Sequence, residues 1–131
     1  MPDAALRQFD LLNVMCYSSY SAAKDALAFY AGEKKIAPTK LVLGVPFFGS
    51  NNDDSREESY KDILAAYPDA WKVDLAGGGT LDEGQAFHYV GEATMALETQ
   101  LGKQYGGLML WELTGDGPPP HSLLTVIESN M

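Results

Sequence analysis

The chain has 131 residues, of which 46% are hydrophobic, so it has the length and composition of one globular domain with a buried core. Its formal charge is −9, with no Lys/Arg cluster that could neutralise phosphates, which argues against nucleic acid and anionic membrane surfaces as partners. One cysteine, Cys16, excludes an internal disulfide and a Cys-rich zinc site, and the two histidines, His88 and His121, lack ligand spacing, so we expect no metal and no cofactor.

The first residues, MPDAALRQFD, do not have the basic start and apolar stretch of a signal peptide. No apolar run approaches the roughly 20 residues that a membrane-spanning helix needs. We therefore expect a soluble chain, and the sequence indicates no compartment.

Three short apolar runs organise the chain, at residues 11–17, 41–48 and 108–113. They are nearly continuous rather than alternating, which is typical of strands covered on both faces in a parallel sheet. Cys16 is expected to point away from Met15 and Tyr17 and to be a buried, inert thiol.

Helical patterns separate and follow these runs. Between the first two, Ser21 is a candidate N-cap, Ala23, Leu27 and Tyr30 share a face, and Gly32 and Pro38 end the pattern. Between the second and third, Val90, Thr94, Leu97 and Leu101 follow helical spacing up to Gly106 and Gly107. After the third, Ser122 is a candidate cap for a helix through Val126 and Ile127. The predicted order is β-α-β-α-β-α.

One insertion interrupts this order, at about residues 50–86. It is longer than the about 2 to 6 residues of an ordinary βα loop, and it contains a predicted small helix near residues 60–67. Long loops at the carboxyl ends of strands carry binding sites in α/β folds. The segment 51–59, NNDDSREES, is expected to be solvated, whereas Tyr60, Tyr67 and Trp71 argue against a wholly inert loop.

The three apolar runs resemble the sixth, seventh and eighth strands of the family 18 glycoside hydrolases, the chitinases and endo-β-N-acetylglucosaminidases. FDLLNVMCYSSY is similar to the family pattern D-x-x-N-V-M-x-Y-D, KLVLGVPFFGS to K-x-x-x-G-x-P-F-Y-G, and YGGLMLWELTGD to G-G-x-M-x-W-E-x-x-x-D. SYKDILAAYPDA also resembles the helix that follows the seventh strand in many bacterial members. The resemblance runs from Phe9 to Ile127.

The resemblance implies an α/β fold, a partial (β/α)8 TIM barrel of about three β-α units with parallel strands and the insertion after the second. Residues 1–131 would form a single C-terminal fragment of a family 18 catalytic domain. The family cleaves β-1,4 bonds between N-acetylglucosamine units, with the acetamide oxygen of the substrate as the nucleophile. The implied partner is chitin or an N-acetylglucosamine oligosaccharide. Many members of the family are secreted.

The resemblance also assigns site residues. Tyr17 matches the tyrosine whose hydroxyl orients the acetamide, and Trp111 matches the tryptophan under the sugar. A flat indole can cover the C–H face of a pyranose ring. Met15 would wall the pocket, Phe48 would line it where the family usually has tyrosine, and Asp10, with Asn13, would support the strand end. Each of these residues could instead serve only in packing.

Glu112 and Asp116, which follow Trp111, each have two possible roles. Glu112 alternates away from Trp111 and is expected to bond helix-side backbone or a neighbouring strand rather than sugar. Asp116 is either a loop cap or a contact at the rim of the site. Gly44, Pro46 and Gly49 fit strand-end geometry without chemistry.

The chain also departs from the family. It contains no D-x-x-D-x-D-x-E run, which carries the proton donor on the fourth strand, and Ser18 stands where the family has aspartate. A complete barrel needs about 250 residues. Two hypotheses follow. In the first, the chain is part of a chitinase-like hydrolase and is inactive alone, because the catalytic acid lies on an N-terminal barrel half. In the second, it is a barrel remnant without catalytic activity that binds carbohydrate or associates with itself. An open parallel sheet leaves two edges to be covered in either case.

Overall fold

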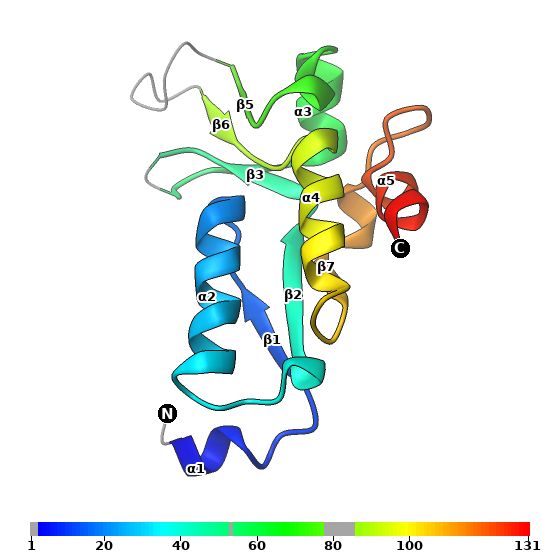
Figure 1. The fold of residues 1–131 in the computed structure, drawn as a ribbon. Helices are drawn as coiled ribbons and strands as arrows, with labels where there is room; N and C mark the ends of the chain where they lie inside the picture. The colour runs from blue at the N-terminus through cyan, green and yellow to red at the C-terminus, as the bar shows by residue number, and fades with distance from the viewer. Residues whose placement is uncertain (1–2, 53, 78–85) are drawn as a thin grey trace.

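A three-stranded parallel sheet lies at the centre of the computed structural model, which describes residues 3–52, 54–77 and 86–131 (Figure 1). Its order is β1-β2-β7, with β1 (Leu12–Met15), β2 (Leu41–Pro46) and β7 (Leu108–Trp111). Both pairings are parallel, as predicted. All six residues of the middle strand β2 are buried, which explains its continuous apolar run.

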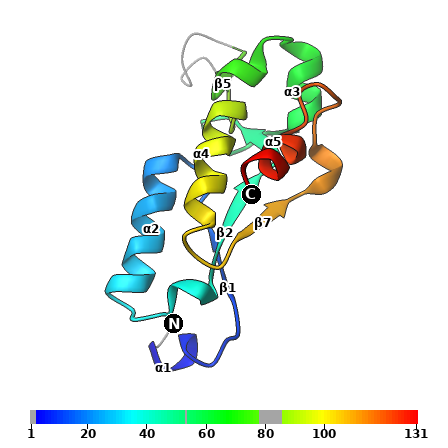
Figure 2. The same cartoon turned by 45° about the vertical axis from the view of Figure 1, so that its right-hand side comes forward.

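Helices alternate with these strands in the predicted order. A short α1 (Asp3–Leu6) precedes β1, α2 (Tyr20–Gly32) joins β1 to β2, α4 (Glu92–Gly102) leads into β7, and α5 (Leu123–Asn130) ends the chain. Both α2 and α4 contact β2, and α4 lies between α2 and α5 (Figure 2). Short 3-10 turns occur at Pro38–Lys40, Ala70–Lys72 and Leu113–Gly115. No helix among the described residues has the length and apolar character needed to cross a membrane.

The predicted cap of α2 is wrong by two residues. Ser19 is the N-cap, and its Oγ accepts a hydrogen bond from the Ala22 N–H at 3.2 Å, whereas Ser21 lies inside the helix. The prediction failed because both serines suit the position and only the path of the chain out of β1 decides between them. The predicted end at Gly32 is confirmed, and so is Ser122 as the cap of α5.

The predicted buried face of α4 is also partly wrong. Leu97 is 47% exposed, and Val90 precedes the helix although it is buried. The buried stripe instead includes Met95 and Thr99, and the Thr99 hydroxyl donates to the Met95 carbonyl at 2.8 Å. The spacing of apolar residues did not predict this face, because Thr99 is polar and yet buried. Its hydroxyl bonds back to its own helix, so it needs no further partner.

The insertion forms a second, antiparallel sheet that the sequence did not predict. Its order is β4-β3-β6-β5, from β3 (Phe48–Ser50), β4 (Glu57–Ser59), β5 (Leu75–Ala76) and β6 (Phe87–His88). The predicted small helix is present as α3 (Tyr60–Ala66). The expectation that 51–59 is solvated is confirmed for most of its described residues, since 52 and 54–57 are exposed, although Asn51 is buried and β4 pairs with β3. Part of the insertion, 78–85, lies outside the described residues.

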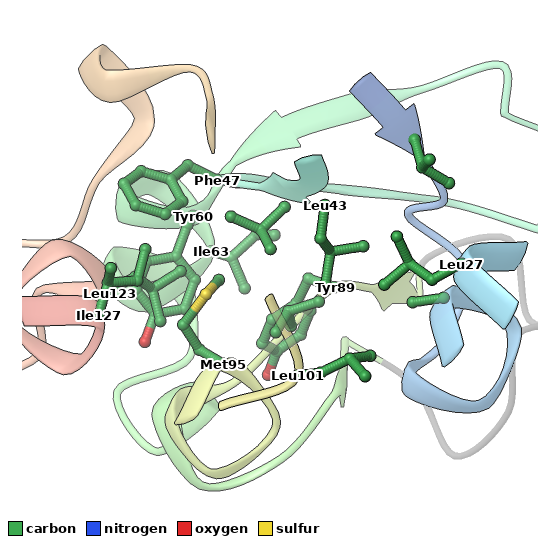
Figure 3. Packing of buried hydrophobic residues seen from close by; sticks show 14 of the residues in the cluster. Leu27, Leu43, Phe47, Tyr60, Ile63, Tyr89, Met95, Leu101, Leu123 and Ile127 are labelled. Atoms are coloured by element: carbon green, nitrogen blue, oxygen red, sulfur yellow. The ribbon is translucent and has the colours of Figure 1, made fainter. Parts of the chain in front are cut away.

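One core joins the two sheets (Figure 3). Leu43 of β2, Phe47 just after it, Tyr60 of α3 and Met95 of α4 are all fully buried within it. On the helix side of β1, Val14 is buried, and Cys16 packs against the same core as strand alternation predicts, although it is only partly buried rather than buried as expected. The insertion is therefore packed as part of the domain, and it holds its sheet at the carboxyl end of β2.

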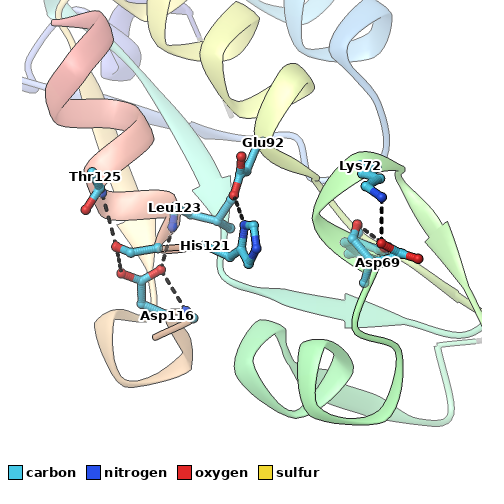
Figure 4. Close-up of polar contacts among 11 residues, drawn as sticks. Asp69, Lys72, Glu92, Asp116, His121, Leu123 and Thr125 are labelled. Carbon is cyan, nitrogen blue, oxygen red and sulfur yellow. Dashed lines mark hydrogen bonds and ion pairs between the residues drawn. The ribbon is translucent and has the colours of Figure 1, made fainter. Parts of the chain in front are cut away.

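Asp116 fixes the connection from β7 to α5 (Figure 4). Its Oδ1 accepts hydrogen bonds from the backbone N–H groups of Gly117 at 2.8 Å and Leu123 at 2.7 Å. Its Oδ2 accepts from the Ser122 hydroxyl at 2.6 Å. Of the two roles left open for Asp116, the geometry selects the loop and helix cap.

We expect Asp116→Ala to lower the free energy of unfolding by about 1–3 kcal/mol, because charge-assisted bonds to the start of α5 are lost. Urea unfolding followed by circular dichroism measures this. Glu128→Ala, at an exposed position of the same helix, is the control and should change stability by less than about 0.5 kcal/mol. Equal losses in the two variants would contradict the capping role.

Candidate active site

One face of the parallel sheet carries large exposed side chains. Strand pairing places Met15, Gly44 and Met109 side by side across the three strands, and Pro46 beside Trp111. A Cβ on Gly44 would lie 3.3 Å from the side chains of both methionines, so glycine at this position leaves them room. Met15 is 65% exposed and Trp111 58% exposed. Exposure of this size is unusual for apolar residues of a central sheet and marks a candidate binding face.

These residues line a hollow of about 750 Å³ at the carboxyl ends of the strands, which we name the platform hollow. Its lining comes from the two outer parallel strands, β1 and β7, from Tyr17 just after β1, and from β3 and β4, and comprises Asn13, Met15, Tyr17, Phe48, Glu57, Met109, Leu110 and Trp111. Of the residues that the sequence predicted for a site, the structure brings together Met15, Tyr17, Phe48 and Trp111.

Tyr17 enters this hollow from the end of β1. Its ring packs edge-on against Phe48, with 5.5 Å between the ring centroids and an interplanar angle of 83°. Its hydroxyl oxygen is buried and has no hydrogen-bond partner among the described residues. Burial raises the pKa of Tyr17 above its usual value, so the hydroxyl keeps its proton and can donate it to a bound acceptor.

Asp10 does not join the other predicted site residues. It precedes the amino end of β1 and is exposed, whereas Tyr17 follows the carboxyl end. The four residues of β1 alone separate the two ends by about 13 Å, at about 3.3 Å per residue. The resemblance to the family 18 motif suggested a common site, but an extended strand carries its two ends apart.

Glu112 lies at the edge of the site in an exposed position. The peptide bond that joins it to Trp111 is cis. Its Oε1 accepts a hydrogen bond from the Thr114 hydroxyl at 2.7 Å, so the carboxylate bonds within its own turn rather than to a neighbouring strand. With Ser59, Lys61 and Trp111 it borders a further hollow beside α3.

A second hollow, which sequence analysis missed, adjoins the first. It has a volume of about 350 Å³, and we name it the polar hollow. Its lining comes from the ends of β1 and β2 and from the insertion, and comprises Tyr17, Ser18, Pro46, Phe48, Ser50, Asp54, Glu57 and His88. If residues 56–59 are taken as a strand, alternation predicts that Arg56 and Glu58 point away from Glu57. The charged residues of this segment favoured a solvated loop instead, so the sequence did not indicate this hollow.

Metal binding finds no support in the part of the chain that the structure describes. No group of three or more His, Cys, Asp or Glu side chains there is arranged to hold a metal ion. His121 instead stacks on Trp71 at 4.6 Å and contacts Glu92 Oε1 through Nδ1 at 2.8 Å (Figure 4). This cluster ties the insertion to α4 and to the turn before α5.

Comparison with solved structures identifies the fold. The GH18 chitinase ChiB from the chitin utilization locus of Flavobacterium johnsoniae superposes on 99% of the chain with a TM-score of 0.83 and 27% identity. The chain has the fold of part of a chitinase barrel. A chitinase from Bacteroides thetaiotaomicron matches 94% of it (TM-score 0.80, 24% identity), and one from Rhizomucor miehei all of it (TM-score 0.71, 17% identity).

The match covers only part of each chitinase. It spans 45% of the Flavobacterium chain, 45% of the Bacteroides chain and 48% of the Rhizomucor chain, so this chain corresponds to about half of those proteins. A search of protein-family models and a search of curated proteins found no match to the sequence. The α/β fold with parallel β-α units, predicted from the sequence, is confirmed as part of a chitinase TIM barrel.

The buried hydroxyl of Tyr17 gives a stability test of the site. We expect Tyr17→Phe to leave the free energy of unfolding unchanged or to raise it, because the variant removes a buried polar group that has no described partner. Urea unfolding measures the change.

Tyr89→Phe is the matched control. The Tyr89 hydroxyl is buried and donates to the Ala70 carbonyl at 2.7 Å, so its removal should cost about 1–2 kcal/mol. A loss in Tyr17→Phe as large as that in Tyr89→Phe would mean that the Tyr17 hydroxyl is needed by the fold rather than by a ligand.

Proposed function

We propose that this chain supplies the sugar-binding side of a chitinase-type site that hydrolyses β-1,4-linked N-acetylglucosamine polymers. One observation carries the proposal: the exposed indole of Trp111 and the unpartnered hydroxyl of Tyr17 line the same hollow at the carboxyl ends of parallel strands. An apolar platform with a few polar groups around it is the usual make-up of a sugar site.

In this proposal the three parallel strands are the sixth, seventh and eighth of a barrel. The order of the motifs along the chain supports this, because FDLLNVMCYSSY, KLVLGVPFFGS and YGGLMLWELTGD supply β1, β2 and β7 in turn. The parallel order β1-β2-β7 is the order that three successive barrel strands would have.

Each platform residue has a defined task. The Trp111 indole covers the C–H face of the sugar, and the Tyr17 hydroxyl donates a hydrogen bond to its acetamide oxygen, which holds that oxygen in line with the anomeric carbon. Met15 supplies an apolar wall for the acetamide methyl group. Phe48 supports the Tyr17 ring through their edge-on contact. Substrate-assisted hydrolysis needs this alignment because the nucleophile belongs to the substrate.

The proton donor of the reaction must come from elsewhere. The sequence contains no D-x-x-D-x-D-x-E run, and Glu112 is bonded in its own turn. The outer edges of β1 and β7 are the places where further barrel strands would pair. We propose that an N-terminal barrel half covers these edges and brings the acid.

A second candidate function is non-catalytic. Leu113 and Trp111 are each 58% exposed, and both outer strands of the sheet are open, which favours a barrel remnant that holds chitin oligomers or associates with another copy through this face. Turnover by a complex of both halves would favour the first candidate, and binding without turnover would favour the second.

We expect Trp111→Ala to weaken the binding of N-acetylglucosamine oligomers by about tenfold or more, which corresponds to about 1.4 kcal/mol. The variant removes the indole surface against which the sugar ring packs. Glu112→Ala should weaken binding by less than about threefold, because that carboxylate bonds to Thr114. Titration calorimetry with both variants measures the difference, and equal or reversed losses would contradict the platform role.

The chain alone should show no measurable hydrolysis of chitin oligomers, because it has no family-type acid. Chromatography of the products after long incubation tests this. If hydrolysis occurs and Glu112→Gln abolishes it, Glu112 is the acid and the proposed division between two barrel halves is wrong.

A further inference from the structure

Several polar groups meet in the polar hollow without partners. The Tyr17 hydroxyl and the Nδ1 atom of His88 are both buried and have no hydrogen-bond partner within the described chain. Ser50 is only 6% exposed and lines the same hollow, and its hydroxyl makes no hydrogen bond to a described residue. Buried polar groups are almost always satisfied in folded proteins, so the two buried, unsatisfied atoms of Tyr17 and His88, together with the unbonded Ser50 hydroxyl, indicate a polar ligand.

These groups come from separate parts of the fold. Tyr17 follows β1, Ser50 ends β3 and His88 ends β6, and Ser50 pairs directly with His88 across the two strands. The pairing of β3 with β6 therefore places both side chains at one point, at the mouth of the platform hollow. Tyr17, Phe48 and Glu57 line both hollows, so a ligand on the platform would continue into the polar hollow.

The charge of the polar hollow is negative. Asp54 and Glu57 line it, and neither carboxylate has an ion pair or a hydrogen bond with the described residues. No lysine or arginine is among the residues that line it. The nearest basic residue in sequence, Arg56, is engaged elsewhere: its Nη2 donates to Glu58 Oε1 at 3.0 Å, and its guanidinium lies 5.0 Å from the centre of the Phe87 ring.

Strand alternation explains this separation. Along β4 successive side chains alternate in direction, and Glu57 lines both the platform hollow and the polar hollow, whereas Glu58 lines neither and pairs with Arg56. Two neighbouring glutamates therefore have different roles. Glu58 is neutralised by arginine, and Glu57 is left as an uncompensated charge at the boundary of the two hollows.

We infer that the polar hollow binds a glucosamine unit, the deacetylated form of the sugar, next to the N-acetylglucosamine on the platform, and that Glu57 selects it through its ammonium group. The inference rests on the proposed function of the platform hollow. A carboxylate bonds an ammonium group more strongly than it bonds a neutral acetamide N–H. Ser50 and His88 Nδ1 bond the hydroxyl groups of the same ring. The preferred substrate is thus a partly deacetylated chitin.

The test compares two tetramers, one fully acetylated and one with a single glucosamine unit. Titration calorimetry with the 131-residue chain should give about three- to tenfold tighter binding of the tetramer that carries glucosamine, and the difference should shrink with rising salt because the charges become screened. Glu57→Gln should abolish the preference.

Glu58→Gln is the matched control, since it removes the same charge from the adjacent residue of β4, which lines neither the platform hollow nor the polar hollow, and it should keep the preference. If the preference is absent, survives in Glu57→Gln or is lost equally in Glu58→Gln, the inference is wrong although the platform still binds sugar. If neither tetramer binds, the proposed function of the platform is wrong, and the inference fails with it.

Discussion

The parallel pairing of β2 with both β1 and β7 is the constraint on which the rest of the structure depends. β2 is buried along its whole length, with β1 and β7 paired on its two sides and α2 and α4 packed against it. Its register sets Met15 beside Gly44 and Met109, and Pro46 beside Trp111. Because parallel strands all end at the same edge of the sheet, the side chains that could bind a ligand gather there.

The end of β2 also joins the sheet to the insertion. Phe47 is fully buried in the core, its N–H donates to the Trp111 carbonyl at 2.7 Å, and its carbonyl accepts from the Tyr60 N–H at 2.9 Å. The next residue, Phe48, begins β3 and packs against Tyr17. One short segment therefore anchors the platform strand, the insertion helix and the wall of the hollow, so the geometry of the site is tied to the stability of the core.

The insertion gives the site its polar side. The parallel sheet supplies mainly apolar surface, from Met15, Met109 and Trp111, whereas the antiparallel sheet supplies Ser50, Glu57 and His88. Such a division suits an amphipathic ligand such as a sugar, which has C–H faces and a rim of hydroxyl groups. The exposed apolar surface and the unsatisfied polar atoms both cost folding free energy, and a bound ligand would remove both costs.

Local patterns in the sequence were enough to give the three strands, the small helix α3 and the Ser122 cap, because apolar runs and caps are properties of neighbouring residues. The gathering of Met15, Tyr17, Phe48 and Trp111 was implied instead by the resemblance to the family 18 glycoside hydrolases. Local patterns did not give the cap of α2, the buried face of α4 or the distance of Asp10 from the site. Nor did they give the polar hollow, since Ser50 and His88 meet only through the pairing of β3 with β6 across a gap of 38 residues. Strand pairing at that separation depends on which surfaces pack in the folded chain, and only the tertiary structure decides it.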